Sequence, residues 1–217
     1  MWWDIAPEWQ ARFEDWHSHE HLPERLAIPG FRRGSRWESV QAAGSFFVLY
    51  ELDSYATLSS PRYLERLNSP SAWSTQLMPH HRNMVRSQCR VLSSFGGGVA
   101  RHVLTLRLSP KLAGMERLRA FLCEQAKRTA SIAGITAVHL LCTDAPDLGS
   151  TTEQQIRGGL DRSADWIVVA GGYELAALER LRAGEMSDAT LSREGAAAGV
   201  EAGQYRLAHA WSRDDPA

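Results

Sequence analysis

Apolar residues along the chain alternate between helical and strand-like spacing, and the glycine run 96–98 separates two sets of such segments. In the first set, the spacing predicts a short strand at 2–5, a helix over 7–27, strands at 31–41 and 45–53, a helix at 59–68 and a strand at 83–95. The stretch 69–81 contains Pro70 and Pro79 and is therefore predicted to be irregular.

The second set repeats this order. Strands are predicted at 99–108, 135–143, 164–171 and 203–211, helices at 111–129 and 174–182, and a polar loop after residue 143. Both halves follow the β-α-β-β-α-β order of a ferredoxin-like unit. We therefore predict an α+β fold of two tandem ferredoxin-like repeats, 1–95 and 99–217, whose bare sheet faces pack together as a pseudo-dimeric α+β barrel within one chain.

The helix predicted over 7–27 carries most of the candidate chemistry. At about 100° per residue, its buried stripe consists of Trp9, Phe13 and Trp16. Glu20 falls within that stripe, and His17 and His21 lie four residues apart along its edge. His19 points to the polar side, so the wheel predicts that it faces water.

Pro23 interrupts this helix, because it lacks an N–H and its ring clashes with the carbonyl of residue 19. A kink or restart there leaves backbone groups near Glu20 and His21 open to a ligand. An ionised Glu20 at the end of an apolar stripe needs a partner, and the candidate cations are Arg25, Arg36, Arg82 and Arg86. Two interpretations follow: Glu20 forms a structural ion pair with an arginine, or it forms an acid/base pair with His21.

Further polar residues complete the predicted site. Tyr50 shares a strand face with apolar neighbours, and at most one of the adjacent His80 and His81 can point inward. The predicted catalytic residues are His21, Glu20 and Tyr50, and the predicted substrate-binding residues are His17, Arg36, Trp73, Arg82, Asn83 and Arg86. His139 and His209 are predicted as wall positions. No acid–imidazole group recurs at 127–129, so a single site is expected, in the first half.

The run 17–21 also matches the HxxEH pattern of inverted zincins. That motif needs further ligands from elsewhere, and Pro23 follows it at once. We therefore predict no metal site and no cofactor, with haem or a divalent metal as the alternatives.

Composition limits the kind of partner. The chain has 217 residues with a net charge of −1, which gives no support to binding of nucleic acid or a membrane surface. Its three cysteines are unclustered, and neither a membrane-spanning run nor a signal peptide is visible. We expect a cytoplasmic protein whose partner is a small-molecule substrate, and a homodimer stays open.

The first half resembles the dimeric α/β-barrel superfamily in the segments WHSHEHLPERLAIPGFRRGSRW, FFVLYEL, SPRYLERLNSPSAW and MPHHRNMVR. It is most similar to EthD-like and related uncharacterised bacterial proteins with a W–x3–EHLPER–x3–PGF signature. The resemblance covers about residues 4–92 and is one of topology alone over 99–217. Members include cofactor-free monooxygenases, muconolactone-type isomerases, polyketide cyclases, aldoxime dehydratases and haem-handling enzymes. The resemblance implies a fold with a cavity, in which His21 matches the signature histidine.

Three functions are compatible with these observations. The first is a cofactor-independent enzyme of the isomerase, cyclase or dehydratase/lyase type, acting by acid/base chemistry on a small apolar or aromatic carbonyl metabolite. The second is a cofactor-free or haem-dependent monooxygenase-like enzyme. The third is a non-catalytic protein that binds a small molecule.

Overall fold

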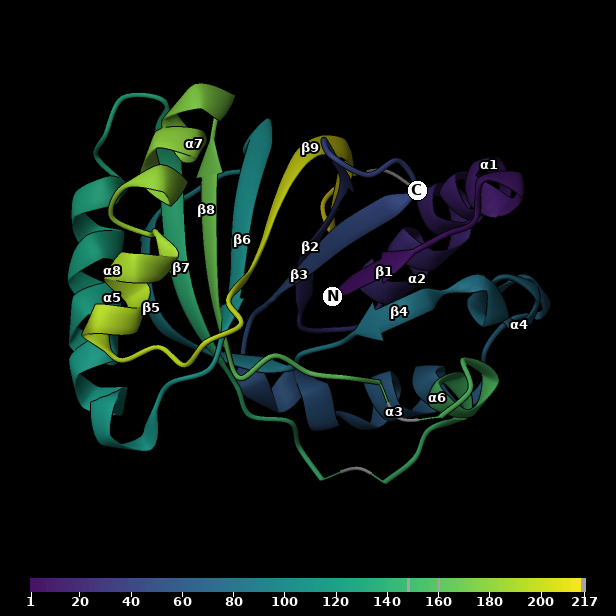
Figure 1. The fold of residues 1–217 in the computed structure, drawn as a ribbon. Helices are drawn as coiled ribbons and strands as arrows, with labels where there is room; N and C mark the ends of the chain where they lie inside the picture. Colours follow the sequence, from purple (N-terminus) through teal and green to yellow (C-terminus); the bar gives the residue numbers. More distant parts are fainter. Residues whose placement is uncertain (148, 160, 216–217) are drawn as a thin grey trace. The chain divides into compact units, whose positions relative to one another are not determined.

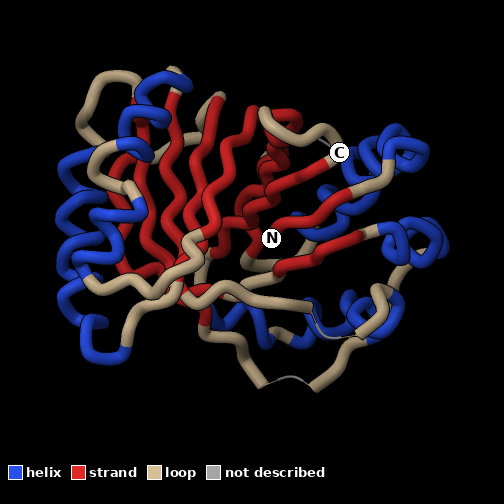
Figure 2. Tube along the Cα trace, viewed as in Figure 1, coloured by secondary structure: helices blue, strands red, loops and turns tan. Residues whose placement is uncertain are grey.

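The computed structural model describes residues 1–147, 149–159 and 161–215, and the chain divides into two compact units (Figure 1). Unit 1 comprises Met1–Gln88, Ala145–Ser163 and Ala208–Ala217, and unit 2 comprises Cys89–Asp144 and Ala164–Leu207. These units differ from the expected halves 1–95 and 99–217, because two segments from the later part of the chain belong to unit 1. Both units combine strands and helices, drawn red and blue in Figure 2.

Unit 1 contains a sheet and several short helices. In chain order its elements are β1 (Trp2–Asp4), α1 (Pro7–Trp16), a π-helical turn (His17–His21), α2 (Leu22–Leu26), β2 (Phe31–Ser39), β3 (Ser45–Leu52), α3 (Pro61–Asn68), α4 (Ala72–Leu77), β4 (Arg82–Val85) and α6 (Thr152–Ile156). The strand order is β4-β1-β3-β2, and the end of β9 (Glu201–Ser212) follows β2. Short 3-10 turns at Tyr55–Ser59 and Met78–His80 precede α3 and β4.

The side chains that alternate along β3 show which face of this sheet the helices cover. Phe46 and Val48 are buried and pack against α1, in a core cluster made of Trp3, Ile5, Phe13, Trp16, Phe46, Val48, Leu77 and Met78. Because strand side chains alternate, Tyr50 lies on this same face of β3. On β2, Gly34 lies opposite Tyr50 and Arg36 lies opposite Val48, so these positions also face the helices.

Unit 2 contains β5 (Cys89–Gly96), β6 (His102–Leu108), α5 (Met115–Thr129), β7 (Ile135–Thr143), β8 (Trp166–Gly172), α7 (Leu175–Ala183), α8 (Asp188–Glu194) and the start of β9. Its strand order is β9-β6-β8-β7-β5, and the pairings of β6, β7 and β8 are antiparallel. In Figure 1, α5, α7 and α8 lie together on one side of these strands. Apolar residues of all three helices join one core cluster with alternate residues of β6, β7 and β8.

The main differences from the sequence prediction are four. The strand predicted at 83–95 is two strands, since β4 pairs with β1 in unit 1 and β5 pairs with β7 in unit 2. The irregular stretch 69–81 contains α4, which Ser71 caps by accepting from the N–H of Ser74. The polar loop after residue 143 contains α6, and α8 was not predicted.

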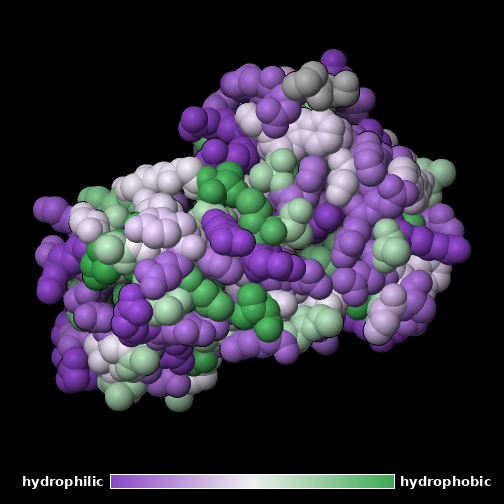
Figure 3. Space-filling model, turned by 90° about the horizontal axis from the view of Figure 1, so that it is seen from above, coloured by the Kyte–Doolittle hydropathy of each residue, from purple (hydrophilic) through white to green (hydrophobic). Residues whose placement is uncertain are grey.

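Hydrophilic residues make up most of the face seen in Figure 3, with apolar residues in smaller groups between them. Within the described part of the chain, no helix has both the length and the apolar character needed to cross a bilayer.

Candidate functional site in unit 1

The helical segment that begins at Pro7 widens between His17 and His21. The backbone N–H of Leu22 donates to the carbonyl of His17, five residues earlier, which is the bond of a π-helical turn. Pro23 then lies in the first turn of α2, where a missing N–H is tolerated. The predicted interruption at Pro23 is therefore a widened turn rather than an end of the helical path. Such turns are frequent at functional sites.

The wider turn changes which side chains face the core. The rings of Trp16 and His21 have centroids 4.5 Å apart. In a regular α-helix, residues five apart would point in directions about 140° apart. The rings of His17 and His21 are 5.5 Å apart, and both residues are buried. His19 is exposed and pairs with Asp15 at 2.9 Å, as the wheel predicts.

His17 lies in the aromatic core of unit 1, with 1% of its surface exposed. Its ring centroid is 5.4 Å from that of Phe13 and 6.1 Å from that of Trp3. Neither ring nitrogen has a hydrogen-bond partner among the described residues. Burial, and then the positive charge of Arg36, hold the pKa of His17 well below its ordinary value. The imidazole is therefore neutral at pH 7, with one nitrogen free to accept a proton.

His21 is in the same state. Burial, followed by the charge of Arg25, holds its pKa well below the ordinary value. Its Nδ1 is buried and has no hydrogen-bond partner within the described chain. The site therefore contains two neutral imidazoles on one helical turn.

His81 adds a third imidazole from the segment before β4. Its ring centroid lies 5.1 Å from that of Trp3 and 5.6 Å from that of Phe13, and its Nδ1 is 3.1 Å from the carbonyl oxygen of Met78. Burial, together with the charge of Arg157, lowers the pKa of His81 to about 4. The neighbouring His80 stacks on Trp9 instead, so only one of the two adjacent histidines points inward, as predicted.

Arg36 and Tyr50 reach the site from the sheet. Arg36 is buried, and its guanidinium donates to the Ser18 hydroxyl at 3.1 Å and to the Glu14 carbonyl at 3.3 Å. Its Nε and the hydroxyl of Tyr50 are buried without a hydrogen-bond partner in the part of the chain that is described. Burial raises the pKa of Tyr50, so its hydroxyl stays protonated and can donate. The sequence predicted both residues as members of the site.

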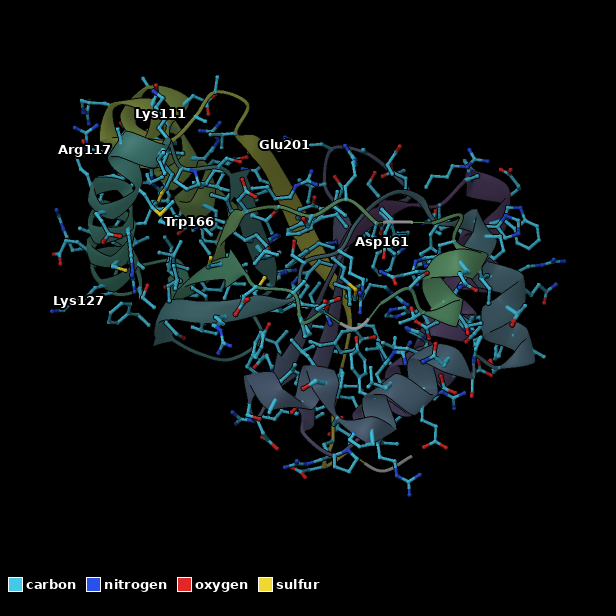
Figure 4. The ribbon with its side chains drawn as sticks, turned by 90° about the horizontal axis from the view of Figure 1, so that it is seen from below. Lys111, Arg117, Lys127, Asp161, Trp166 and Glu201 are labelled. Atoms are coloured by element: carbon cyan, nitrogen blue, oxygen red, sulfur yellow. The ribbon has the colours of Figure 1, made fainter. Side chains whose placement is uncertain are left out.

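Arg25 is buried beside His21 and forms an ion pair with Glu153 of α6. Glu153 is also 3.7 Å from Arg157, which binds Asp161 through two nitrogens at 2.7 and 3.3 Å. Asp161 follows α6 and is labelled in Figure 4. Nη1 of Arg25 has no partner among residues 1–147, 149–159 and 161–215. The segment 145–163 thus supplies the counter-charges that hold Arg25 in place.

Glu20 does not have either of its two predicted partners. It is half-buried and accepts hydrogen bonds from the Trp16 indole at 3.0 Å and from the hydroxyls of Ser71 and Ser74 at 2.5 and 3.3 Å. No ion pair of Glu20 with an arginine, and no hydrogen bond to His21, is found among the described residues. The reason is the π-helical turn, which rotates His21 into the core and leaves Glu20 over α4.

Four predicted substrate-binding residues make no hydrogen bond or ring contact with the imidazoles among the described residues. Trp73 of α4 is half-buried against the core cluster, and Arg82 is exposed in β4. Asn83 is exposed, has a φ of 54° and donates to Asp4 at 2.7 Å, which is a structural role. Arg86 donates to the Tyr63 hydroxyl at 2.8 Å, at the edge of the Arg25 network.

Sequence reasoning missed three contributors to the site. Arg25 was weighed only as a partner of Glu20, and His81 only as one of a pair. Glu153 was not considered, although Thr151 and Gln154 form a capping box that signals the start of α6. Nothing in the local pattern indicates that this short helix is buried.

The arrangement favours proton transfer from a weakly acidic apolar ligand. Neutral imidazoles can accept a proton, and the free donors of Arg36, Arg25 and Tyr50 can stabilise the negative charge that results. A metal site of three or more His, Cys, Asp or Glu side chains is not found among the described residues. The HxxEH run therefore has no third ligand of this kind beside His17 and His21.

No family model matches the sequence, and no curated protein matches it. Solved structures do. An anthrone oxidase-like protein superposes with a TM-score of 0.65 at 13% identity, covering 99% of this chain and 92% of that one. A protein from Fusobacterium nucleatum described as a putative monooxygenase superposes with a TM-score of 0.63 at 6% identity, covering 97% of this chain and 91% of that one. A protein of the same description from Lactobacillus acidophilus superposes with a TM-score of 0.57 at 8% identity, covering 98% of this chain and 94% of that one.

These similarities establish the fold. The chain has a mixed α+β fold with a large antiparallel sheet, matching neighbours of the dimeric α+β barrel type. At such low identity they say nothing about individual site residues.

Proposed function

We propose that the chain is a cofactor-independent oxygenase that deprotonates an enolisable aromatic carbonyl compound and allows the resulting carbanion to react with O2. The observation that carries the proposal is His17, a neutral imidazole buried among aromatic rings with both nitrogens unpartnered among the described residues. The names of the structural neighbours support oxygenation at least as well as the isomerase or lyase reaction.

The first step is removal of a proton from the carbon next to the substrate carbonyl by His17. The charge moves to the carbonyl oxygen, where Nε of Arg36 donates a hydrogen bond. The rings of Trp3 and Phe13 pack against the His17 ring and limit access of water to the base.

O2 then oxidises the carbanion. A carbon–oxygen bond forms, and the peroxide takes up the proton that His17 holds. A second proton leaves the same carbon, the O–O bond breaks and hydroxide departs as water after protonation. In sum, one methylene group and one molecule of O2 become one ketone carbonyl and one molecule of water, with no other oxidant or reductant.

An isomerase or lyase reaction is the second candidate, and the spacing of His17 and His21 favours it specifically. Two neutral imidazoles with ring centroids 5.5 Å apart can remove a proton at one carbon and return it at another. Such a reaction shares the first step but consumes no O2.

The tandem ferredoxin-like arrangement is part of the proposal. The strand order of unit 1 is β4-β1-β3-β2, and unit 2 contains the order β9-β6-β8-β7. If β6, β7, β8 and β9 are counted as the first to fourth strands of a repeat, both orders are 4-1-3-2. This supports two repeats of one fold, with β5 as an addition to the second. We retain the cytoplasmic location and the small-molecule partner as proposals as well.

The test combines two assays of the purified protein. Under argon in D2O, we expect exchange of the acidic C–H of anthrone at a rate above the buffer background. In air, we expect one O2 consumed for each anthraquinone formed, without added flavin, nicotinamide or metal and in the presence of a chelator.

Exchange without O2 consumption would favour the isomerase or lyase candidate. Neither activity, across a panel of enolisable aromatic ketones, would favour a binding protein. Activity that appears only after loading with haemin or a divalent metal would overturn the cofactor-independent proposal.

A further inference from the structure

Two buried arginines, Arg25 and Arg36, lie beside the imidazoles of unit 1. Arg25 and Arg157 are matched by Glu153 and Asp161 within one network. Arg36 has no ion pair with a carboxylate among the described residues, since its guanidinium donates to the Ser18 hydroxyl and the Glu14 carbonyl oxygen. The three imidazoles are neutral and add no charge. Arg36 is therefore a buried cation without an ion pair among the described residues, and a buried charge of this kind is costly.

The unpartnered donors lie at this same place. Nη1 of Arg25, Nε of Arg36 and the Tyr50 hydroxyl are all buried without partners in the described residues. Arg25 and Arg36 are each 4% exposed. A buried donor that is left unsatisfied costs about 1–3 kcal/mol, and more when it is charged. Both arginines interact electrostatically with Tyr50, so one bound acceptor in this region would satisfy these donors.

We infer that the site binds its aromatic substrate through a carboxylate, held by Nη1 of Arg25 and the Tyr50 hydroxyl. The inference rests on the proposed function for the reaction, but it concerns a second group of the substrate and is tested by binding alone. It assigns Arg25 to substrate binding and makes Glu153 a positioning residue.

The chemistry of the site favours a carboxylate over other anions. The free donors are few and stand among the rings of Trp16, Phe31 and Tyr63, which suit a small planar anion on an aromatic skeleton. Tyr50 and Arg25 come from different elements, and each interacts electrostatically with the other. Two carboxylate oxygens can take one donor from each.

Isothermal titration with three probes of one skeleton tests the inference: 2-naphthoate, the neutral isostere 2-naphthamide and 2-naphthyl phosphate. We expect 2-naphthoate to bind at least about tenfold more tightly than the amide, a difference of about 1.4 kcal/mol. Equal binding of acid and amide, no binding of 2-naphthoate at millimolar concentration, or a preference for the phosphate would each overturn it.

Variants test which residues cause the preference for the carboxylate over the amide. The pair Arg25→Gln/Glu153→Gln removes both charges together, so no buried carboxylate is left alone, and it should abolish the preference for 2-naphthoate over 2-naphthamide. Arg25→Lys keeps the charge but not the planar fork and should reduce the preference. Arg33→Gln, which breaks a half-exposed pair with Glu51, is the matched control and should leave it unchanged. A preference that survives in the double variant contradicts the assignment of Arg25.

The two proposals fail in different ways. If 2-naphthoate binds as expected but no substrate is oxidised, the carboxylate site stands and the oxygenase proposal fails. If neutral ketones are oxidised as fast as their carboxylated analogues and the acid shows no binding advantage, the oxygenase stands and the carboxylate site fails.

Discussion

His17 and His21 lie four residues apart on one π-helical turn, with ring centroids 5.5 Å apart, and both are buried in the aromatic core of unit 1. Their neutrality follows from burial and from the neighbouring arginines, which would repel an imidazolium. Both the reactivity and the pH dependence of unit 1 therefore depend on these neutral bases and their neighbouring cations.

The substitution His17→Asn removes the proposed base and keeps a polar side chain of smaller size. We expect kcat for C–H exchange and O2 consumption to fall by about 10²–10⁴-fold, the usual contribution of general base catalysis. His19→Asn is the matched control, because His19 is on the same turn but exposed. Equal losses in both variants, or full activity in His17→Asn with an unchanged Tm, would exclude His17 as the base.

Stability should decrease in mild acid. Because the folded-state pKa of His81 is about 4, against an ordinary value near 6.5, the unfolded chain binds a proton that the folded chain excludes between these values. The stabilisation is complete above pH 6.5 and is lost as the pH falls. Its slope is up to about 1.4 kcal/mol per pH unit for each such imidazole. His17 and His21 act in the same direction.

Urea unfolding at a series of pH values measures this slope. In the variant His81→Asn, the free energy of unfolding should fall less steeply with pH than in the wild type, by up to about 1.4 kcal/mol per pH unit. A free energy of unfolding that is the same at pH 7 and pH 5 would contradict the predicted neutrality of the buried histidines.

Gly34 makes room for Tyr50. A Cβ at this position would stand 2.3 Å from Cδ2 of Leu22 and 2.8 Å from Cε1 of Tyr50. We expect Gly34→Ala to destabilise the protein by about 1–3 kcal/mol and to weaken 2-naphthoate binding by moving the Tyr50 ring. Gly97→Ala is the control, since a Cβ there meets nothing within 4 Å. Thermal melts and titration of both variants check this. Unchanged 2-naphthoate binding in Gly34→Ala would show that the Tyr50 hydroxyl does not hold the ligand.

Sequence patterns predicted most strands because alternation is a local property. The bounds of β7 were predicted at both ends, and β2 and β3 differ by one or two residues. The strand at 83–95 was wrong in part, because its halves pair with different strands, β1 and β7, and pairing partners are not encoded locally.

The helical wheel failed where the helix departs from regular geometry. It placed Glu20 in the buried stripe because it assumed about 100° per residue through the whole segment. The π-helical turn breaks that assumption after His17, as the hydrogen bond of Leu22 and the contact between the Trp16 and His21 rings show. Likewise, Glu153, Arg157 and Asp161 follow the i, i+4 spacing typical of a solvated face, yet their side chains are only 6–7% exposed. Burial of α6 depends on tertiary contacts, such as the Asn68 side chain accepting from the Thr152 N–H at 3.1 Å.

The ion pair between Arg25 and Glu153 should be costly to break from one side. Glu153→Gln leaves Arg25 buried without its carboxylate, and we expect a loss of about 3–5 kcal/mol in the free energy of unfolding, whereas Arg25→Met/Glu153→Met should lose less than Glu153→Gln alone. The half-exposed pair of Arg33 and Glu51 is the comparison, and Arg33→Gln should cost about 0–1 kcal/mol. Urea unfolding of the three variants decides the matter. If Glu153→Gln is no more harmful than Arg33→Gln, then Arg25 does not depend on Glu153 for its charge balance, and the positioning role given to Glu153 is wrong.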